Sequence, residues 1–346
     1  GAVIRGVNKY GPLMRAVIAS ASNDHRLGAN EAPPAILSVY LGDQLEKVFQ
    51  DIKDGNIASS KQGGEMDLGL SQILKFERDP GDRNRTSPFA FTGNRFEFRA
   101  VGSSQSVSGP LVAMNTILAD SLDWIAEKLE SELAKTESRT TAVLAVLKTL
   151  MEENGNVVFG GDGYSAEWHK MAVEERGLKN LPTSADALPY LRDESIRELF
   201  KRTNVFSPVE LESRFEVYAE QYILSIEVEA KLVIEMAKTM IYPAATQYLG
   251  ELSMTCSGMT DLGIEMDNSI ASSIANETNA MIAAVAELSK AITKHDFDSI
   301  EAHMNYCAND IHTLMDKVRA HVDALETEVA DDLWPLPKYR EMLFIK

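Results

Sequence analysis

Residues 94–99 alternate charged and aromatic side chains in a pattern that predicts a β-strand with one chemically active face. They read Asn-Arg-Phe-Glu-Phe-Arg. Successive side chains of a strand point to opposite faces, so Arg95, Glu97 and Arg99 share one face and the two phenylalanines lie on the other. Guanidinium groups bind carboxylates and phosphates, and a carboxylate between them can hold a divalent metal. The row is therefore either a binding face or the solvated side of a two-sided antiparallel strand.

A second set of charged residues lies upstream, in sequence that forms loops. Residues 23–34 run Asn-Asp-His-Arg-Leu-Gly-Ala-Asn-Glu-Ala-Pro-Pro, and residues 82–87 run Asp-Arg-Asn-Arg-Thr-Ser. Glycine and proline predict that the first stretch is a rigid loop between helical segments. Binding residues concentrate on such loops, so Arg26 and Glu31 are candidate functional residues. This second cluster favours the binding interpretation of the strand.

Further long motifs continue through nearly the whole chain. They are Asn-Arg-Thr-Ser-Pro-Phe-Ala-Phe-Thr-Gly-Asn at 84–94, Val-Gly-Ser-Ser-Gln-Ser at 101–106, Gly-Asp-Gly-Tyr-Ser-Ala-Glu-Trp at 161–168 and Trp-Pro-Leu-Pro at 334–337. Together with the two stretches above, they resemble the second half of glutamine synthetase, and most closely the long type III branch of that family. Motifs of this length are specific.

The resemblance implies ATP-dependent ligation of ammonia to L-glutamate, giving L-glutamine through a γ-glutamyl phosphate intermediate. The implied cofactors are ATP and Mg²⁺ or Mn²⁺, because phosphoryl transfer needs metal ions and fixed cations around the phosphate. The implied partners are L-glutamate, ammonium and further copies of the chain in stacked hexameric rings. Cysteine usage and the N-terminal sequence, described below, predict a cytoplasmic protein.

The resemblance assigns the substrate-binding and ammonium-binding tasks to three residues. Arg26 and Arg99 match the arginines that hold the substrate glutamate, which suits a guanidinium facing a carboxylate. Glu31 matches the loop glutamate that closes over the site and helps to bind and deprotonate ammonium.

The same resemblance assigns phosphate binding and metal binding to three other residues. Arg85 matches the catalytic arginine that stabilises the transferring phosphate, and Arg95 matches an arginine that faces the nucleotide phosphates. Glu97 matches the carboxylate ligand of the metal that bridges the ATP phosphates. These matches agree with the strand alternation, which places Arg95 and Glu97 on one face.

The sequence departs from the commoner family members in two places. Those members carry another arginine five residues after the one matched by Arg85, where this chain has Ala90. The loop from Arg26 to Glu31 is also one residue shorter. We further expect the family's other metal-binding glutamates, and the small domain that a neighbouring subunit lends to each site, to lie upstream of residue 1. The chain alone is therefore expected to be inactive.

Composition and charge exclude several classes of partner. The 346 residues carry a formal net charge of −18, which argues against nucleic acid and anionic membranes as general partners. The two cysteines form no disulfide framework or metal pattern, as expected of a reduced cytosolic protein. No run approaches the roughly 18 apolar residues of a membrane helix. The N-terminus lacks the layout of a signal peptide, and the missing initiator methionine indicates an excised or processed piece.

Hydrophobic periodicity predicts an α+β protein in which the C-terminal half of a catalytic sheet-and-helix domain precedes a mostly α-helical bundle. We place the domains at 1–133 and 134–346, the second with an extended tail. Strands are predicted at 67–76 and 88–101. A helix interrupted at Gly11-Pro12 is predicted over 3–20, and a capping box at Ser207 opens a run that ends at Tyr242-Pro243. Further helices are predicted at 35–50, 110–133, 139–153, 244–257, 263–293 and 296–327.

Two alternatives remain to the ligase hypothesis. The chain could be a non-catalytic helical assembly module of a ring-shaped complex, or a related ligase that joins glutamate to another amine. Glu31 favours ammonia over bulkier amines. The Gly-rich stretch at 160–163 lacks the Lys-Ser/Thr of a phosphate-binding loop and is predicted to be a turn between helices.

Overall fold

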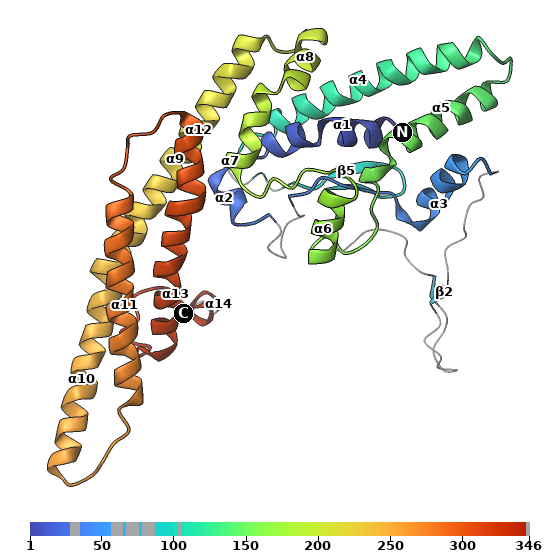
Figure 1. The fold of residues 1–346 in the computed structure, drawn as a ribbon. Helices are drawn as coiled ribbons and strands as arrows, with labels where there is room; N and C mark the ends of the chain where they lie inside the picture. Colours follow the sequence, from blue (N-terminus) through green and yellow to red (C-terminus); the bar gives the residue numbers. More distant parts are fainter. Residues whose placement is uncertain are drawn as a thin grey trace. The chain divides into compact units, whose positions relative to one another are not determined.

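The computed structural model describes residues 1–27, 35–56, 87–100, 102 and 105–343, and the backbone alone of residues 65–66, 76–77 and 340. Two compact units divide the chain, Gly1–Tyr218 and Ala219–Lys346. Most described residues are helical, and a small three-stranded sheet lies in the first unit, so the protein is α+β (Figure 1). The predicted domain boundary at 133/134 stays a prediction.

The first helix, α1 (Ala2–Ala16), is kinked at the place the sequence predicts. Tyr10 leaves helical geometry, with φ −125° and ψ 22°, two residues before Pro12. A proline inside a helix lacks an N–H donor and crowds the preceding turn, which explains the break. Apolar side chains on both sides of the kink are buried, so α1 forms the centre of the unit's core.

Two long antiparallel helices, α4 (Ser108–Leu133) and α5 (Arg139–Asn154), pack beside α1 (Figure 1). Gly6 makes the approach of α1 to α4 close, because a Cβ atom there would lie 2.5 Å from Ile117 Cγ2. Both helices begin within two residues of their predicted starts and end within one of their predicted ends. The remaining helices of the unit are α2 (Ala21–Asp24), α3 (Gly42–Lys53), α6 (Ala166–Glu174), α7 (Ser184–Ala187), α8 (Glu194–Arg202) and two 3₁₀ turns, Gly155–Val157 and Leu188–Arg192.

A buried carboxylate ties three of these helices together. Asp120 of α4 accepts a hydrogen bond of 2.6 Å from Arg5 of α1, and it also pairs with Arg202 of α8. Lys9 Nζ lies 3.7 Å from the same carboxylate. Burial alone would raise the pKa of Asp120, but the Arg5 hydrogen bond and the surrounding positive charges outweigh it and hold the pKa below its ordinary value. The carboxylate is therefore ionised in the folded protein.

The sheet consists of β1 (Val39–Tyr40), β4 (Phe89–Phe91) and β5 (Phe96–Phe98), in the order β1-β4-β5. β4 and β5 form an antiparallel hairpin, and β1 pairs with β4 in parallel. A parallel bridge from Val39 to Val158 and a 3.0 Å hydrogen bond from the Phe159 N–H to the Val39 carbonyl extend the pairing beyond β1. A separate antiparallel pair joins β2 (Glu65–Met66) to β3 (Phe76–Glu77).

The helix predicted over 35–50 is wrong in its first part. Residues 39–40 form β1, and α3 begins only at Gly42. A short run that is apolar on both faces fits a buried parallel strand as well as a buried helix, and periodicity cannot separate the two. The strand predicted over 67–76 lies outside the described residues except for Phe76, which belongs to β3.

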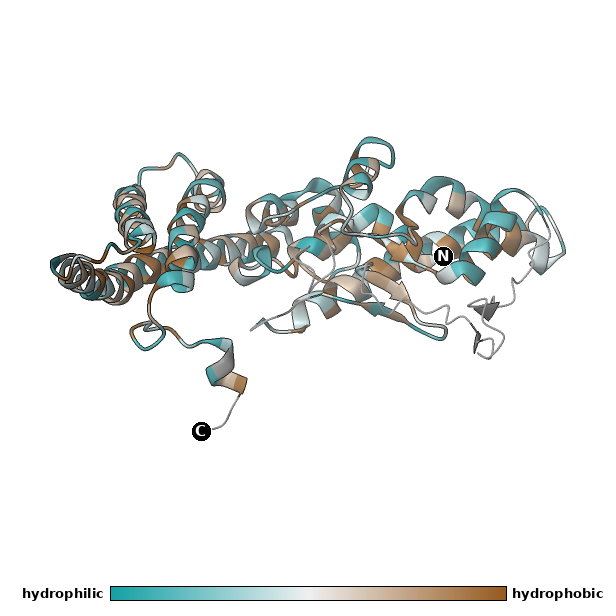
Figure 2. Cartoon of the chain, turned by 90° about the horizontal axis from the view of Figure 1, so that it is seen from below, coloured by the Kyte–Doolittle hydropathy of each residue, from teal (hydrophilic) through white to brown (hydrophobic). Residues whose placement is uncertain are grey.

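The second unit consists of helices packed along their lengths. The helix α9 (Pro208–Met236) begins in the first unit and ends in the second, and its capping box is present, with the Ser207 N–H 2.8 Å from Glu210 Oε2. Hydrophilic and hydrophobic residues alternate along the helical ribbons, as expected of helices that bury one face (Figure 2). The other helices are α10 (Tyr242–Asp261), α11 (Ser269–Ala291), α12 (Ile300–Tyr306), α13 (His312–Glu328) and α14 (Tyr339–Leu343).

The predicted helix end at Tyr242-Pro243 is also wrong. A π-helical turn, Ala237–Ile241, joins α9 directly to α10, and Pro243 stands in the first turn of α10. A π turn widens the helix just before the proline, so the missing N–H and the ring do not stop the chain. A second π turn, Cys307–Ile311, joins α12 to α13 in the same way.

Candidate functional site

The β4–β5 hairpin carries the charged row on one face, as the alternation predicts. Its turn is closed by a 2.9 Å hydrogen bond from the Thr92 N–H to the Arg95 carbonyl. Gly93 has φ +95°, a backbone conformation that side chains disfavour, so glycine suits this position. The turn thereby sets which residues of β5 face which residues of β4.

Both arginines of the row contact the carboxylate between them. Arg95 Nη2 lies 3.1 Å from Glu97 Oε1, and Arg99 Nε lies 3.4 Å from Glu97 Oε2. Such i, i+2 contacts require the three side chains to share a face. The Arg95 side chain is 72% exposed, that of Glu97 35% and that of Arg99 16%. Exposure thus decreases along the row, from the guanidinium of Arg95 to that of Arg99.

The aromatic residues form the opposite face. Phe89 lies with its ring centroid 5.9 Å from that of Phe96 and 5.6 Å from that of Phe98, and Phe91 lies 5.2 Å from Phe96. These are the separations of packed aromatic pairs. Phe89 is buried, whereas Phe96 and Phe98 are only half-buried. β5 is an edge strand of this sheet in the described chain, so it pairs with a neighbouring strand on one side.

The face that carries Glu97 continues across all three strands. The register sets Glu97 opposite Ala90, and Ala90 opposite Tyr40 of β1. Gly160 lies against the same tyrosine, since a Cβ atom on it would be 3.8 Å from Tyr40 Cε2. Tyr40 was missed as a neighbour of the row because its segment was assigned to a helix. The signal that was available is the short apolar run after Pro33-Pro34, which is typical of a buried strand.

Arg26 follows the short helix α2. Ser20 caps this helix by accepting a 3.3 Å hydrogen bond from the Asn23 N–H. The Asn23 carbonyl then accepts the N–H groups of Arg26 and Leu27 at 3.0 and 2.9 Å. The backbone that carries Arg26 is therefore fixed by the end of α2.

The described structure brings together three of the six candidate residues, Glu97 on β5 and the flanking Arg95 and Arg99, and gives Arg26 a defined backbone position. Glu31 and Arg85 lie outside the described residues. The predicted turn at 160–163 lies between the 3₁₀ turn Gly155–Val157 and α6.

Comparisons with known proteins agree with the motifs. A family model described as the glutamine synthetase C-terminal domain matches residues 142–260. A protein of Dictyostelium discoideum named type-3 glutamine synthetase is 39% identical over 355 residues, which cover 100% of this chain and 48% of that protein. Glutamine synthetases of Bacteroides fragilis and Butyrivibrio fibrisolvens are 35% and 33% identical, each over 99% of this chain and 49% of their own length.

The chain is similar to glutamine synthetases along its whole length, and residues 142–260 match the C-terminal domain of that family. It spans about half the length of the curated relatives it matches.

A glutamine synthetase needs a divalent metal, and Glu97 is a chemically suitable ligand for one. Its carboxylate oxygens are the hard donors that Mg²⁺ and Mn²⁺ prefer, and the side chain is partly open to solvent. Within the described ranges, no group of three or more histidine, cysteine or acidic residues is arranged to hold a metal ion. Glu97 therefore fits as one ligand among several.

Among the helices that the structure describes, none is both long enough and apolar enough to span a membrane.

Proposed function

We propose that the protein to which this chain belongs is a glutamate–ammonia ligase that consumes ATP and forms L-glutamine through γ-glutamyl phosphate. The observation that supports it most is the shared face of Arg95, Glu97 and Arg99, in a chain that matches type-3 glutamine synthetase along its whole length. The row combines a carboxylate with two guanidiniums, which suits a metal ion and anionic substrates meeting at one surface.

Each residue of the row suits a different part of this reaction. Arg99, largely covered, would bind the carboxylate of glutamate with its planar fork, as would Arg26. Arg95, largely exposed, would face the phosphates of ATP. Glu97 would hold Mg²⁺ or Mn²⁺, which when bound neutralises phosphate oxygens as charge moves between them.

Two residues outside the described ranges complete the proposal. Glu31 would bind ammonium and accept its proton, and Arg85 would stabilise the transferring phosphoryl group.

We also propose a cytoplasmic location and assembly into stacked hexameric rings. Exposed apolar side chains near the α10–α11 connection, Met254, Leu262 and Ile270, are consistent with contacts to further chains.

The direct test compares this chain with the full-length protein. Both are incubated with ATP, L-glutamate, ammonium and Mg²⁺, and glutamine and phosphate are measured. We expect the full-length protein to form both products in equal amounts, and the 346-residue chain to form neither, because Glu97 would be its one carboxylate ligand of the metal. Glutamine formation by the chain at the full-length rate would contradict the assignment of the missing ligands. No glutamine from the full-length protein would contradict the proposed function.

The two arginines that flank β5 test which substrate each of them binds, and each variant serves as the control for the other. Arg99→Lys in the full-length enzyme keeps the charge and removes the bidentate fork, so the KM for glutamate should rise by about tenfold. The KM for ATP should stay within about twofold. Arg95→Lys is the matched control, since both arginines contact Glu97. It should raise the KM for ATP instead, and the reverse pattern would exchange the two roles.

A further inference from the structure

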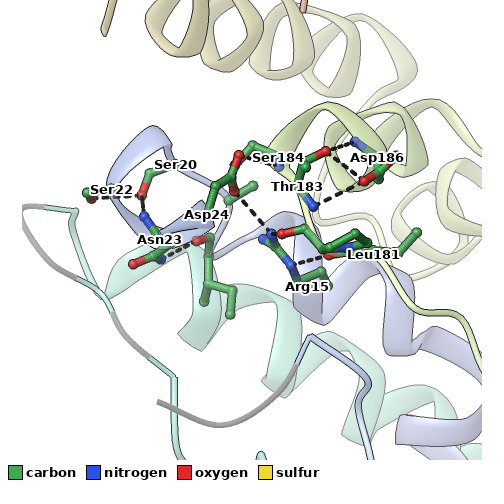
Figure 3. A network of polar contacts seen from close by, with 12 residues as sticks. Arg15, Ser20, Ser22, Asn23, Asp24, Leu181, Thr183, Ser184 and Asp186 are labelled. Atoms are coloured by element: carbon green, nitrogen blue, oxygen red, sulfur yellow. Dashed lines mark hydrogen bonds and ion pairs between the residues drawn. The ribbon is translucent and has the colours of Figure 1, made fainter. Parts of the chain in front are cut away.

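A buried polar network joins the segment before Arg26 to a loop far along the chain (Figure 3). Asp24, the last residue of α2, and Ser184, the first residue of α7, are 160 positions apart. Asp24 Oδ2 accepts the Ser184 N–H at 2.8 Å, and Asp24 Oδ1 accepts the Ser184 hydroxyl at 2.8 Å. Both carboxylate oxygens are therefore engaged by one residue.

Arg15 of α1 closes the network from a third element. Its Nη2 group lies 3.3 Å from Asp24 Oδ1, and both side chains are nearly buried, 1% and 6% exposed. The same guanidinium donates to the carbonyls of Leu181 and Pro182 at 2.8 and 3.1 Å. Charge-assisted hydrogen bonds in a buried setting are strong, and breaking one partner is costly. The end of α2 is thus held to both α1 and the loop at 181–184.

The network reaches Arg26 through the main chain. Asn23, next to Asp24, donates from Nδ2 to the Ile18 carbonyl at 2.5 Å, and its own carbonyl accepts the N–H groups of Arg26 and Leu27. A shift of Asp24 would move the Asn23 carbonyl and with it the backbone of Arg26. A binding arginine contributes fully only when its geometry is set before the ligand arrives.

We propose that Asp24 is a positioning residue for glutamate binding: clamped by Ser184 and Arg15, it fixes the turn from which Arg26 meets the substrate carboxylate. The proposal rests on the function proposed above. It gives the region around α7 a part in substrate binding, in addition to any part in assembly.

The experiment uses the full-length protein with Asp24→Asn and Ser184→Ala. Asp24→Asn removes the charge from the clamp, and Ser184→Ala removes one hydrogen bond and keeps the Asp24–Arg15 pair. The matched control is Asp186→Asn, which weakens the cap of the same short helix, where Asp186 bonds Thr183. Two quantities are measured: hydrogen exchange at the Arg26 and Leu27 amides, and the KM values for glutamate and for ATP.

Both clamp variants should exchange faster at these two amides than the unmodified protein and the control. Asp24→Asn should raise the KM for glutamate by about tenfold, which corresponds to a loss of ~1.4 kcal/mol in binding free energy. Ser184→Ala should raise it by less. The KM for ATP should change by less than about twofold in both, a split that general loosening of the fold would not give.

Three results would overturn the proposal: unchanged exchange, faster exchange with an unchanged KM for glutamate, or the same effects in Asp186→Asn. If Asp24→Asn fails to fold, Ser184→Ala decides alone. A full-length protein that makes no glutamine would refute the proposed function and with it the role in glutamate binding, and the exchange measurement would still show whether the clamp holds the turn.

Discussion

Replacing Glu97 by glutamine in the full-length enzyme is expected to lower kcat/KM by about 100-fold or more. The amide keeps the shape of the side chain and one hydrogen-bond acceptor, so the contacts to Arg95 and Arg99 are retained in part. It removes the negative charge that a hard divalent cation requires. The concentration of Mg²⁺ needed for half-maximal activity should therefore rise together with the loss of rate.

The measurement is a set of steady-state rates over a series of Mg²⁺ concentrations, with circular dichroism to confirm folding. Glu216→Gln is the control, because Glu216 is an exposed carboxylate on α9. It should leave rate and metal dependence unchanged. Near-normal turnover of Glu97→Gln with the usual Mg²⁺ dependence would exclude Glu97 as a metal ligand.

The largest loss of stability is expected for Asp120→Ala. The side chain of Asp120 is 5% exposed and pairs with Arg5, whose side chain is 9% exposed. Removing the carboxylate leaves the Arg5 guanidinium charged and buried, a change that costs about 3–5 kcal/mol in the free energy of unfolding. Urea unfolding of the chain, followed by circular dichroism, measures the change. Asp123→Ala is the matched control: Asp123 lies on the same helix, is largely exposed and lies 3.8 Å from Arg202. It should cost less than about 1 kcal/mol.

Asp120 also predicts a pH dependence. Its pKa in the folded protein is below the ordinary value, so the stability it contributes is complete above an ordinary carboxyl pKa of about 3.9 and is lost as the pH falls through the lowered value. The difference in unfolding free energy between the unmodified chain and Asp120→Ala should therefore be largest near neutral pH and shrink in acid. A difference that grew as the pH fell would contradict this.

Local patterns predicted the parts of the fold that depend on neighbours in sequence. The alternation at 94–99 predicted the shared face of Arg95, Glu97 and Arg99, because period 2 is a property of a strand by itself. The proline in α1 and the capping box at Ser207 predicted a kink and a helix start for equally local reasons.

Features that depend on distant partners were not predictable in this way. β1 is a strand because Val39 and Tyr40 pair with β4, some fifty positions away. The clamp on Asp24 needs Ser184, and no short-range pattern reports that contact. Met236 and Met266 lie in segments predicted to be amphipathic helices but are exposed, because periodicity identifies an apolar face without showing what covers it. The roles proposed for the site residues came from motifs, and among them the described geometry constrains only Arg26, Arg95, Glu97 and Arg99.

The bridge between Val39 and Val158 bears on how this family's sequences are divided. The stretch matched by the family model starts at residue 142, inside α5, and ends at 260, one residue before the end of α10. Within it, Val158 pairs with β1, and Ser184 bonds Asp24, both partners lying before residue 142. The boundary at residue 142 thus marks where related sequences begin to align, and it is not a structural domain boundary. Gene fusions, exchanges between relatives or expressed fragments that cut there would sever a shared sheet and a shared core.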